Sequence, residues 1–167
     1  MSLPTGDPAS VSALGGTLLT QSARLADLVT DLGGSGARAR RRSLEDPSAH
    51  ERLLLERAAT ELDRVGALLQ AWTTTAVDAA ARARQLEPDL TRADLVVEGQ
   101  LVVESSGPSR VDPETRARER VRLQELLNRV TMVRARELAR LGRELQQSHD
   151  ALAAVAHDAR AGRSATS

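Results

Sequence analysis

The sequence predicts an all-α protein: a long antiparallel helical hairpin, a third and shorter N-terminal helix, and a small β-hairpin between helices two and three. Three observations support this fold class. Leu and Ala dominate the apolar residues, Asp-Pro dipeptides precede three long helix-favouring runs, and the 167 residues include a single aromatic one, Trp72. β-Sandwiches and barrels build their cores from β-branched and aromatic side chains, so the composition disfavours them.

The three Asp-Pro dipeptides are helix-start signals. Asp at the N-cap accepts hydrogen bonds from unpaired amide groups, and Pro at the first helical position lacks the N–H that would stay unpaired. The dipeptides are Asp7-Pro8, Asp46-Pro47 and Asp112-Pro113. We therefore predict helices over 8–32, 47–86 and 113–160.

The first helix is expected to stop at the glycine run Gly33-Gly34-Ser35-Gly36, since glycine supplies left-handed C-cap conformations at little cost. A Gly/Arg linker over 33–46 and a disordered tail over 161–167 complete a single helical domain, 1–167. Apolar residues recur every three or four positions along the first helix, with Gln21 as the one polar interruption. They are Val11, Leu14, Leu18, Leu25, Leu28 and Leu32.

The second helix carries an unbroken heptad seam of the coiled-coil kind. Its members are Leu55, Ala58, Leu62, Val65, Leu69, Trp72, Ala76, Ala79, Ala83 and Leu86. The third helix carries a similar seam whose phase slips between 131 and 137, where Arg134 or Glu137 would otherwise face it. A stutter at that point would locally unwind the supercoil.

The segment 87–112 is predicted to hold the β-hairpin. The sequence Leu-Val-Val-Glu occurs at 95–98 and again at 101–104, on either side of Gly99-Gln100. Two Val-rich runs separated by a Gly-X pair favour a two-residue type II′ turn. Because an isolated two-stranded hairpin is marginal in water, this one must pack on the end of the helical bundle or on a partner.

Helix lengths predict an incompletely covered seam. At 1.5 Å per residue the second helix is roughly 60 Å long and the third roughly 70 Å, against under 40 Å for the first. Either the uncovered length is an exposed interaction groove, or it is a two-helix coiled coil that needs no third helix. A protein partner or a second copy would bind through the seam, and the 95–104 hairpin is a second candidate contact through edge-strand pairing. The candidate interaction residues are Leu62, Val65, Leu69, Trp72, Leu138, Leu141 and Leu145.

Residue types needed for several kinds of catalysis are missing. The chain has no Cys, and all of its basic residues are Arg, which excludes thiol nucleophiles, Schiff bases and P-loops. The pairs His149-Asp150 and His157-Asp158 lack the i, i+4 spacing of two metal ligands on one helix. We expect no enzyme, no catalytic, metal or cofactor site, and no small-molecule substrate.

Arginine clusters at 38–42 and 116–122 raise nucleic-acid binding as an alternative function, although the net charge of the chain is zero. A phage or structural scaffold protein is a further alternative. No apolar run is long enough to span a bilayer. The N-terminus lacks the pattern of a signal peptide, so the expected location is the cytoplasm, with export by a signal-peptide-independent route as the alternative.

The opening Gly6-Asp7-Pro8 before an amphipathic helix, the segment 97–104 and the following Gly107-Pro108 resemble actinobacterial helical proteins related to the Trp-x-Gly hairpin family of type VII secretion. Trp72 is followed by Thr73-Thr74, and no Tyr is present for a C-terminal export signal. The resemblance implies a helical dimer, or a cytosolic partner or chaperone of an exported protein. It implies no enzymatic activity. The leading expectation is therefore a non-enzymatic helical protein–protein interaction module.

Overall fold

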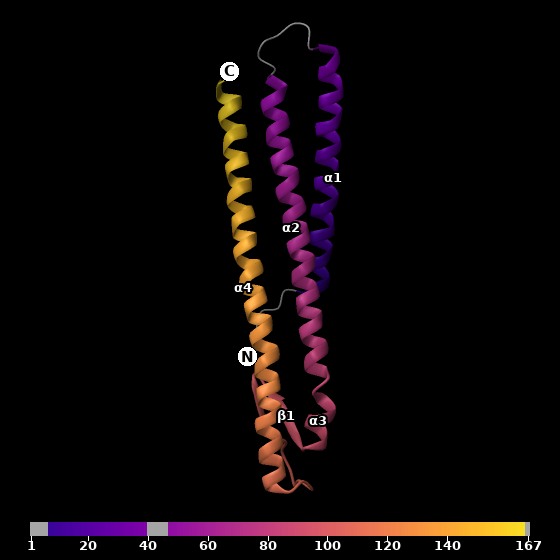
Figure 1. The fold of residues 1–167 in the computed structure, drawn as a ribbon, viewed down its shortest axis with the longest axis vertical. Helices are drawn as coiled ribbons and strands as arrows, with labels where there is room; N and C mark the ends of the chain where they lie inside the picture. Colours follow the sequence, from indigo (N-terminus) through magenta and orange to yellow (C-terminus); the bar gives the residue numbers. More distant parts are fainter. Residues whose placement is uncertain (1–6, 40–46, 166–167) are drawn as a thin grey trace. The chain divides into compact units, whose positions relative to one another are not determined.

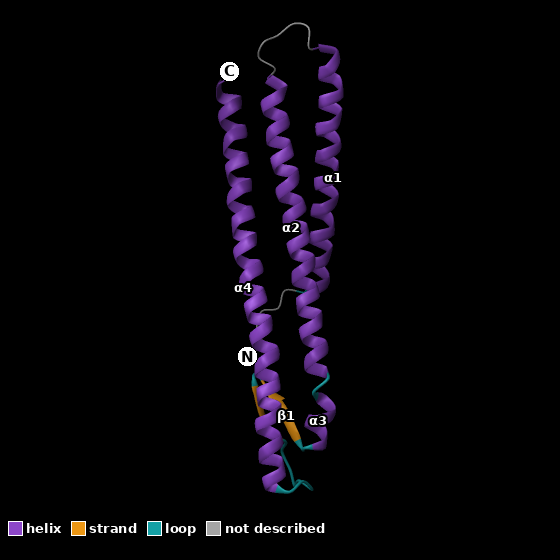
Figure 2. Ribbon diagram, viewed as in Figure 1, coloured by secondary structure: helices purple, strands orange, loops and turns teal. Residues whose placement is uncertain are grey.

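The computed structural model describes residues 7–39 and 47–165, which form long helices with a two-stranded β-hairpin between them (Figures 1 and 2). The elements are α1 (Pro8–Ala39), α2 (Pro47–Arg84), α3 (Glu87–Arg92), β1 (Leu95–Glu98), β2 (Leu101–Glu104) and α4 (Pro113–Ala165). The predicted mainly α fold with an inserted hairpin is confirmed. Within the described ranges no helix has the length and hydropathy needed to cross a membrane.

The three long helices begin at the prolines that the sequence indicated. At α4 the capping contact is visible: the backbone N–H of Thr115 donates to Asp112 Oδ2 at 3.0 Å. This hydrogen bond to the charged carboxylate holds the pKa of Asp112 below its ordinary value. Asp46, the predicted cap of α2, lies outside the described residues.

Two helices extend beyond their predicted ends. α1 continues through the glycine run to Ala39, so its predicted end at 32 and the linker start at 33 were wrong; 40–46 lies outside the described residues. Glycine permits a C-cap without requiring one, and its cost inside a helix is only about 1 kcal/mol. α4 likewise continues to Ala165, into the tail predicted to be disordered, because Ala and Arg favour helix there. Residues 166–167 lie outside the described part.

The sequence interpretation missed the short helix α3. α2 ends at Arg84, and α3 follows where the hairpin segment was expected to begin. Pro88 stands in its first turn, together with the carboxylates of Glu87 and Asp89. These are the same start signals that located the long helices, but without an Asp in front of the proline.

The described residues form two compact units. Of these residues, unit 1 comprises 7–8 and 72–140, and unit 2 comprises 9–39, 47–71 and 141–165. α2 and α4 each contribute residues to both units. The prediction of one domain over 1–167 stays a prediction.

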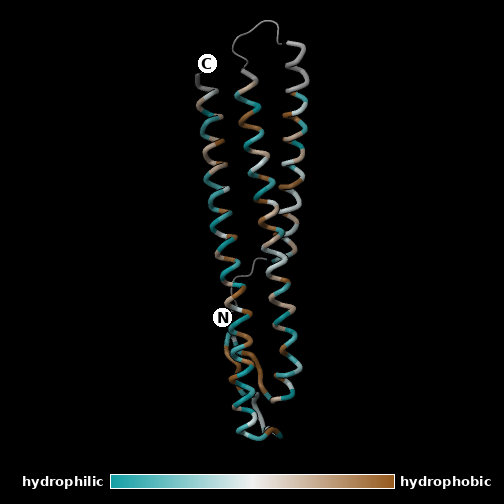
Figure 3. The backbone as a smooth tube through the Cα atoms, in the orientation of Figure 1, coloured by the Kyte–Doolittle hydropathy of each residue, from teal (hydrophilic) through white to brown (hydrophobic). Residues whose placement is uncertain are grey.

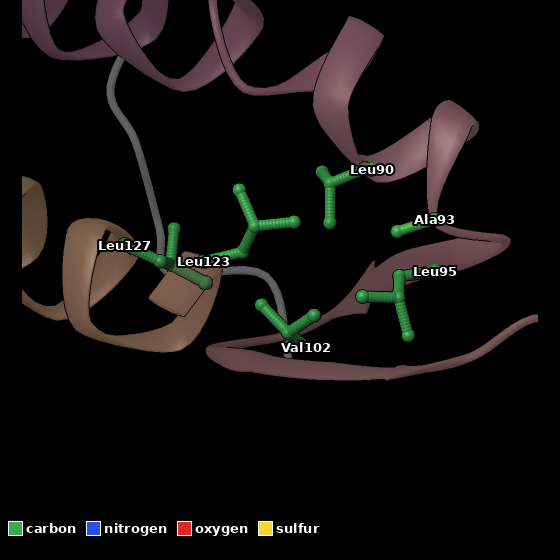
Figure 4. Close-up of a cluster of buried hydrophobic side chains, with 6 residues drawn as sticks. All are labelled: Leu90, Ala93, Leu95, Val102, Leu123 and Leu127. Atoms are coloured by element: carbon green, nitrogen blue, oxygen red, sulfur yellow. The ribbon is translucent and has the colours of Figure 1, made fainter. Parts of the chain in front are cut away.

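Unit 1 has its core where the hairpin meets the helices (Figure 4). Leu90 of α3 and Leu123 and Leu127 of α4 enclose side chains from both strands. The cluster consists of Leu90, Ala93, Leu95, Val102, Leu123 and Leu127. The hairpin therefore packs on helices of its own chain, which was one of the two predicted alternatives.

The hairpin has the predicted two-residue turn. Leu95 pairs with Glu104 and Glu98 pairs with Leu101, which leaves Gly99 and Gln100 as the loop. Gly99 has φ +66°, whereas Gln100 is not among the residues with positive φ. A type II′ turn needs positive φ at its first central residue only, so Gly at position 99 satisfies it.

Asp94 joins the start of the hairpin to the loop that leaves it. Its φ is +52°, in the left-handed region that Asp tolerates better than most residues. Its backbone carbonyl accepts from the N–H of Ser105 at 3.0 Å, and its carboxylate accepts from Ser109 Oγ at 2.6 Å. These bonds fix the loop after β2 against the residue before β1.

An ion-pair network ties α3 to α4. Arg122 Nη2 lies 2.8 Å from Asp89 Oδ2, and Arg122 Nε lies 2.8 Å from Glu119 Oε2. Arg92 lies 2.8 Å from the other carboxylate oxygen of Asp89. The hydrogen bond from Arg122 is the main reason that the pKa of Asp89 is lowered.

The network predicts an acid-sensitive contribution to stability. A carboxyl whose pKa is depressed in the folded state stabilises it above about pH 4, and loses that contribution as pH falls through the folded pKa. We expect Asp89→Asn to unfold at lower urea at neutral pH and to show a flatter decline on acidification than the native chain. Glu87→Gln, on the same helix, is the control; identical acid profiles for all three proteins would contradict this assignment.

Candidate functional site

The predicted interaction residues are divided between the two units. Leu62, Val65, Leu69, Leu141 and Leu145 lie in unit 2, and Trp72 and Leu138 lie in unit 1. Leu141 is fully buried, and the other six are partly buried. All seven are thus at least partly buried, while their role in binding a partner stays a prediction.

In unit 2, α2 contacts α1 and α4 on nearly opposite sides. Arg57 lies 3.3 Å from Asp158 of α4, whereas Ala59 accepts a hydrogen bond from Ser22 of α1. Two turns further along α2, Arg64 bonds Gln147 of α4, and Gly66 approaches Leu19 of α1. Residues two apart on a helix point about 200° apart. The three helices of this unit therefore form a layer with α2 in the middle, as Figure 1 shows.

Both contacts in this layer are antiparallel. Ser12 bonds Gln70 and Ser22 bonds Ala59, so residue numbers rise along α1 as they fall along α2. The pairs Arg57–Asp158 and Arg64–Gln147 run in opposite directions in the same way. The predicted antiparallel hairpin of the second and third helices is thus present within unit 2.

Small residues carry the contact of α1 with α2. Ser12 Oγ donates to Gln70 Oε1 at 3.1 Å, and Gln70 Nε2 returns a bond of 2.9 Å to the Ser12 carbonyl. Between these polar contacts the two backbones come close at Gly15 and Gly66: a Cβ on Gly66 would lie 3.0 Å from the Gly15 carbonyl oxygen. The α1 residues of this contact are Ser12, Gly15, Leu19 and Ser22.

The heptad stripe of α1 is a different set of positions, of which three are exposed and three are partly buried. Leu14 is 53% exposed and Leu28 is 51% exposed, and Leu32 is exposed as well. The stripe residues precede members of the small-residue contact by one position, which rotates them by about 100° away from α2. α1 therefore contacts α2 through Ser12, Gly15, Leu19 and Ser22, while Leu14, Leu28 and Leu32 stay exposed.

The α1 stripe and the predicted α2 seam lie on the same broad face of the layer. A Cβ on Gly15, the contact residue next to Leu14, would lie 3.0 Å from Gln70 Nε2 and 3.2 Å from Leu69 Cβ, and Ser12 on the other flank bonds Gln70. Leu62 precedes Arg64 by two residues, and Leu145 precedes Gln147 by two, so both leucines point away from the polar contact of α2 with α4. We call this surface of unit 2 the apolar face. It comprises Val11, Leu14, Leu18, Leu25, Leu28 and Leu32 of α1, Leu55, Leu62, Val65 and Leu69 of α2, and Leu145 of α4.

The opposite broad face is polar. It carries the contacts Arg57–Asp158 and Arg64–Gln147 and a groove lined by polar and apolar side chains, namely Leu53, Glu56, Arg57, Thr60, Glu61, Ala151 and Val155. The alternation of hydrophilic and hydrophobic residues along the helices is visible in Figure 3. The two faces of the layer thus differ in chemistry as well as in position.

The predicted phase slip in α4 coincides with an open groove in unit 1. Arg134 and Glu137 are partly buried and line the groove together with Asp78 and Arg82 of α2. The Nε of Arg134 is buried without a hydrogen-bond partner. Arg134 and Glu137 therefore lie at this groove, and the local unwinding expected from a stutter stays a prediction.

The outer edge of β2 is contacted by α4, whereas several apolar side chains of the hairpin are exposed. The N–H of Val102 donates to Gln124 Oε1 at 2.7 Å, and Gln124 Nε2 donates to the Gln100 carbonyl at 2.9 Å. The Gln124 side chain from α4 thus takes two of the backbone groups at the outer edge of β2, through which a strand adding to β2 would pair. The exposed apolar side chains of the hairpin are Val96, Val97 and Leu101.

The remaining candidates from the sequence are placed as follows. His149 is exposed and lies 3.3 Å from Asp150, whose pKa it lowers, and no group of three or more potential metal ligands occurs in residues 7–39 and 47–165. In the second arginine cluster, Arg116 pairs with Glu104, Arg118 with Glu114, and Arg122 with Asp89. Arg40, Arg41 and Arg42 of the first cluster lie outside the described residues.

No protein-family model, curated protein or solved structure matches the chain.

The close approach of α1 and α2 predicts opposite effects of alanine at two glycines. In Gly66→Ala the new Cβ would lie 2.7 Å from Leu19 Cγ, so we expect overpacking that costs about 1–3 kcal/mol. At Gly16 no atom lies within 4 Å of an added Cβ, so Gly16→Ala should gain about 1 kcal/mol of helix stability. Urea unfolding of the two variants measures the difference, and equal gains would contradict the α1–α2 contact.

Proposed function

We propose that this chain is a non-enzymatic protein–protein interaction module that binds a helix on the apolar face of unit 2. The single observation that carries the proposal is the exposure of Leu14 and Leu28, each more than half exposed, at heptad spacing on α1. The bound helix belongs to a second copy of the chain or to another protein.

Burying these leucine side chains against a partner is more favourable in free energy than leaving them in water. Burying an exposed Leu side chain contributes about 1.5–3 kcal/mol. Alternating spacings of three and four residues over 11–32 give a straight seam, and a seam of this kind fits another helix better than an irregular surface. Leu62, Val65 and Leu69 of α2 extend the surface beside this seam, which makes it broad enough for a helix lying between α1 and α2.

We also propose the biological setting that the sequence resemblance implies: a type VII secretion-associated protein, or a cytosolic partner or chaperone of one. A location in the cytoplasm belongs to this proposal, with export by a signal-peptide-independent route as its alternative. Nucleic-acid binding is less well supported, because Arg116, Arg118 and Arg122 are each engaged by carboxylates of the chain.

Light scattering over a concentration series tests the proposal, with Leu28→Glu as the disrupting variant. Leu53→Glu is the matched control, because Leu53 is 52% exposed in the same unit but lies at the groove of the polar face. We expect a dimer that Leu28→Glu converts to monomer and that Leu53→Glu leaves intact. Circular dichroism of both variants checks that the helices are retained.

A monomeric native chain separates the remaining outcomes. Binding of a hydrophobic dye that Leu28→Glu reduces and Leu53→Glu does not would support a different protein as the partner. A monomer that binds no dye, or an association insensitive to Leu28→Glu, would contradict the proposed function.

A further inference from the structure

We draw no further inference here: the strongest candidate, the apolar face of unit 2 with the exposed Leu14, Leu28 and Leu32 of α1, is an unpartnered surface, and nothing in the structure shows what covers it.

Discussion

Unit 2 depends on the packing of α2 against two helices on opposite sides. On one side the backbones of Gly15 and Gly66 approach so closely that a Cβ on either would lie 3.0–3.1 Å from the carbonyl oxygen of the other. On the other side, contacts such as Arg57–Asp158 accompany the buried stripe of α4 that contains Leu141. Because the two contacts are opposed, the helices form a layer, and a layer of three helices has two broad faces that it cannot bury itself.

The amino acids on these two faces differ accordingly. The polar face carries charged and polar side chains such as Arg57, Asp158 and Arg64, which water solvates at little cost. The apolar face consists of Leu and Val. A row of leucines at regular spacing on an exposed helix has no solvation advantage over alanine, which is why we connect this face with binding rather than with stability.

The sequence predicted features that local residue chemistry decides. Asp112 before Pro113 caps a helix wherever the chain is placed, and Gly99 supplies the one positive φ that the two-residue turn needs. Features that depend on which of two neighbouring helices a residue packs against were not predictable from local chemistry. A heptad pattern identifies one stripe for one partner, but α2 has two partners, so Leu54 and Leu68 are buried although Leu55 and Leu69 were assigned to the seam. The face shared by α1 and α2 could be found only once Gly15 was seen beside Leu69.

Gln124 has a consequence for the solubility of the chain. The two Leu-Val-Val-Glu sequences form the segment of the chain with the highest β propensity. Short Val-rich strands with an open edge are the kind of sequence that stacks into fibrils. The amide of Gln124 takes the N–H of Val102 and the carbonyl of Gln100, the groups through which β2 would recruit another strand. One glutamine side chain on α4 thus limits the sheet on that side to two strands and keeps its growth from competing with folding.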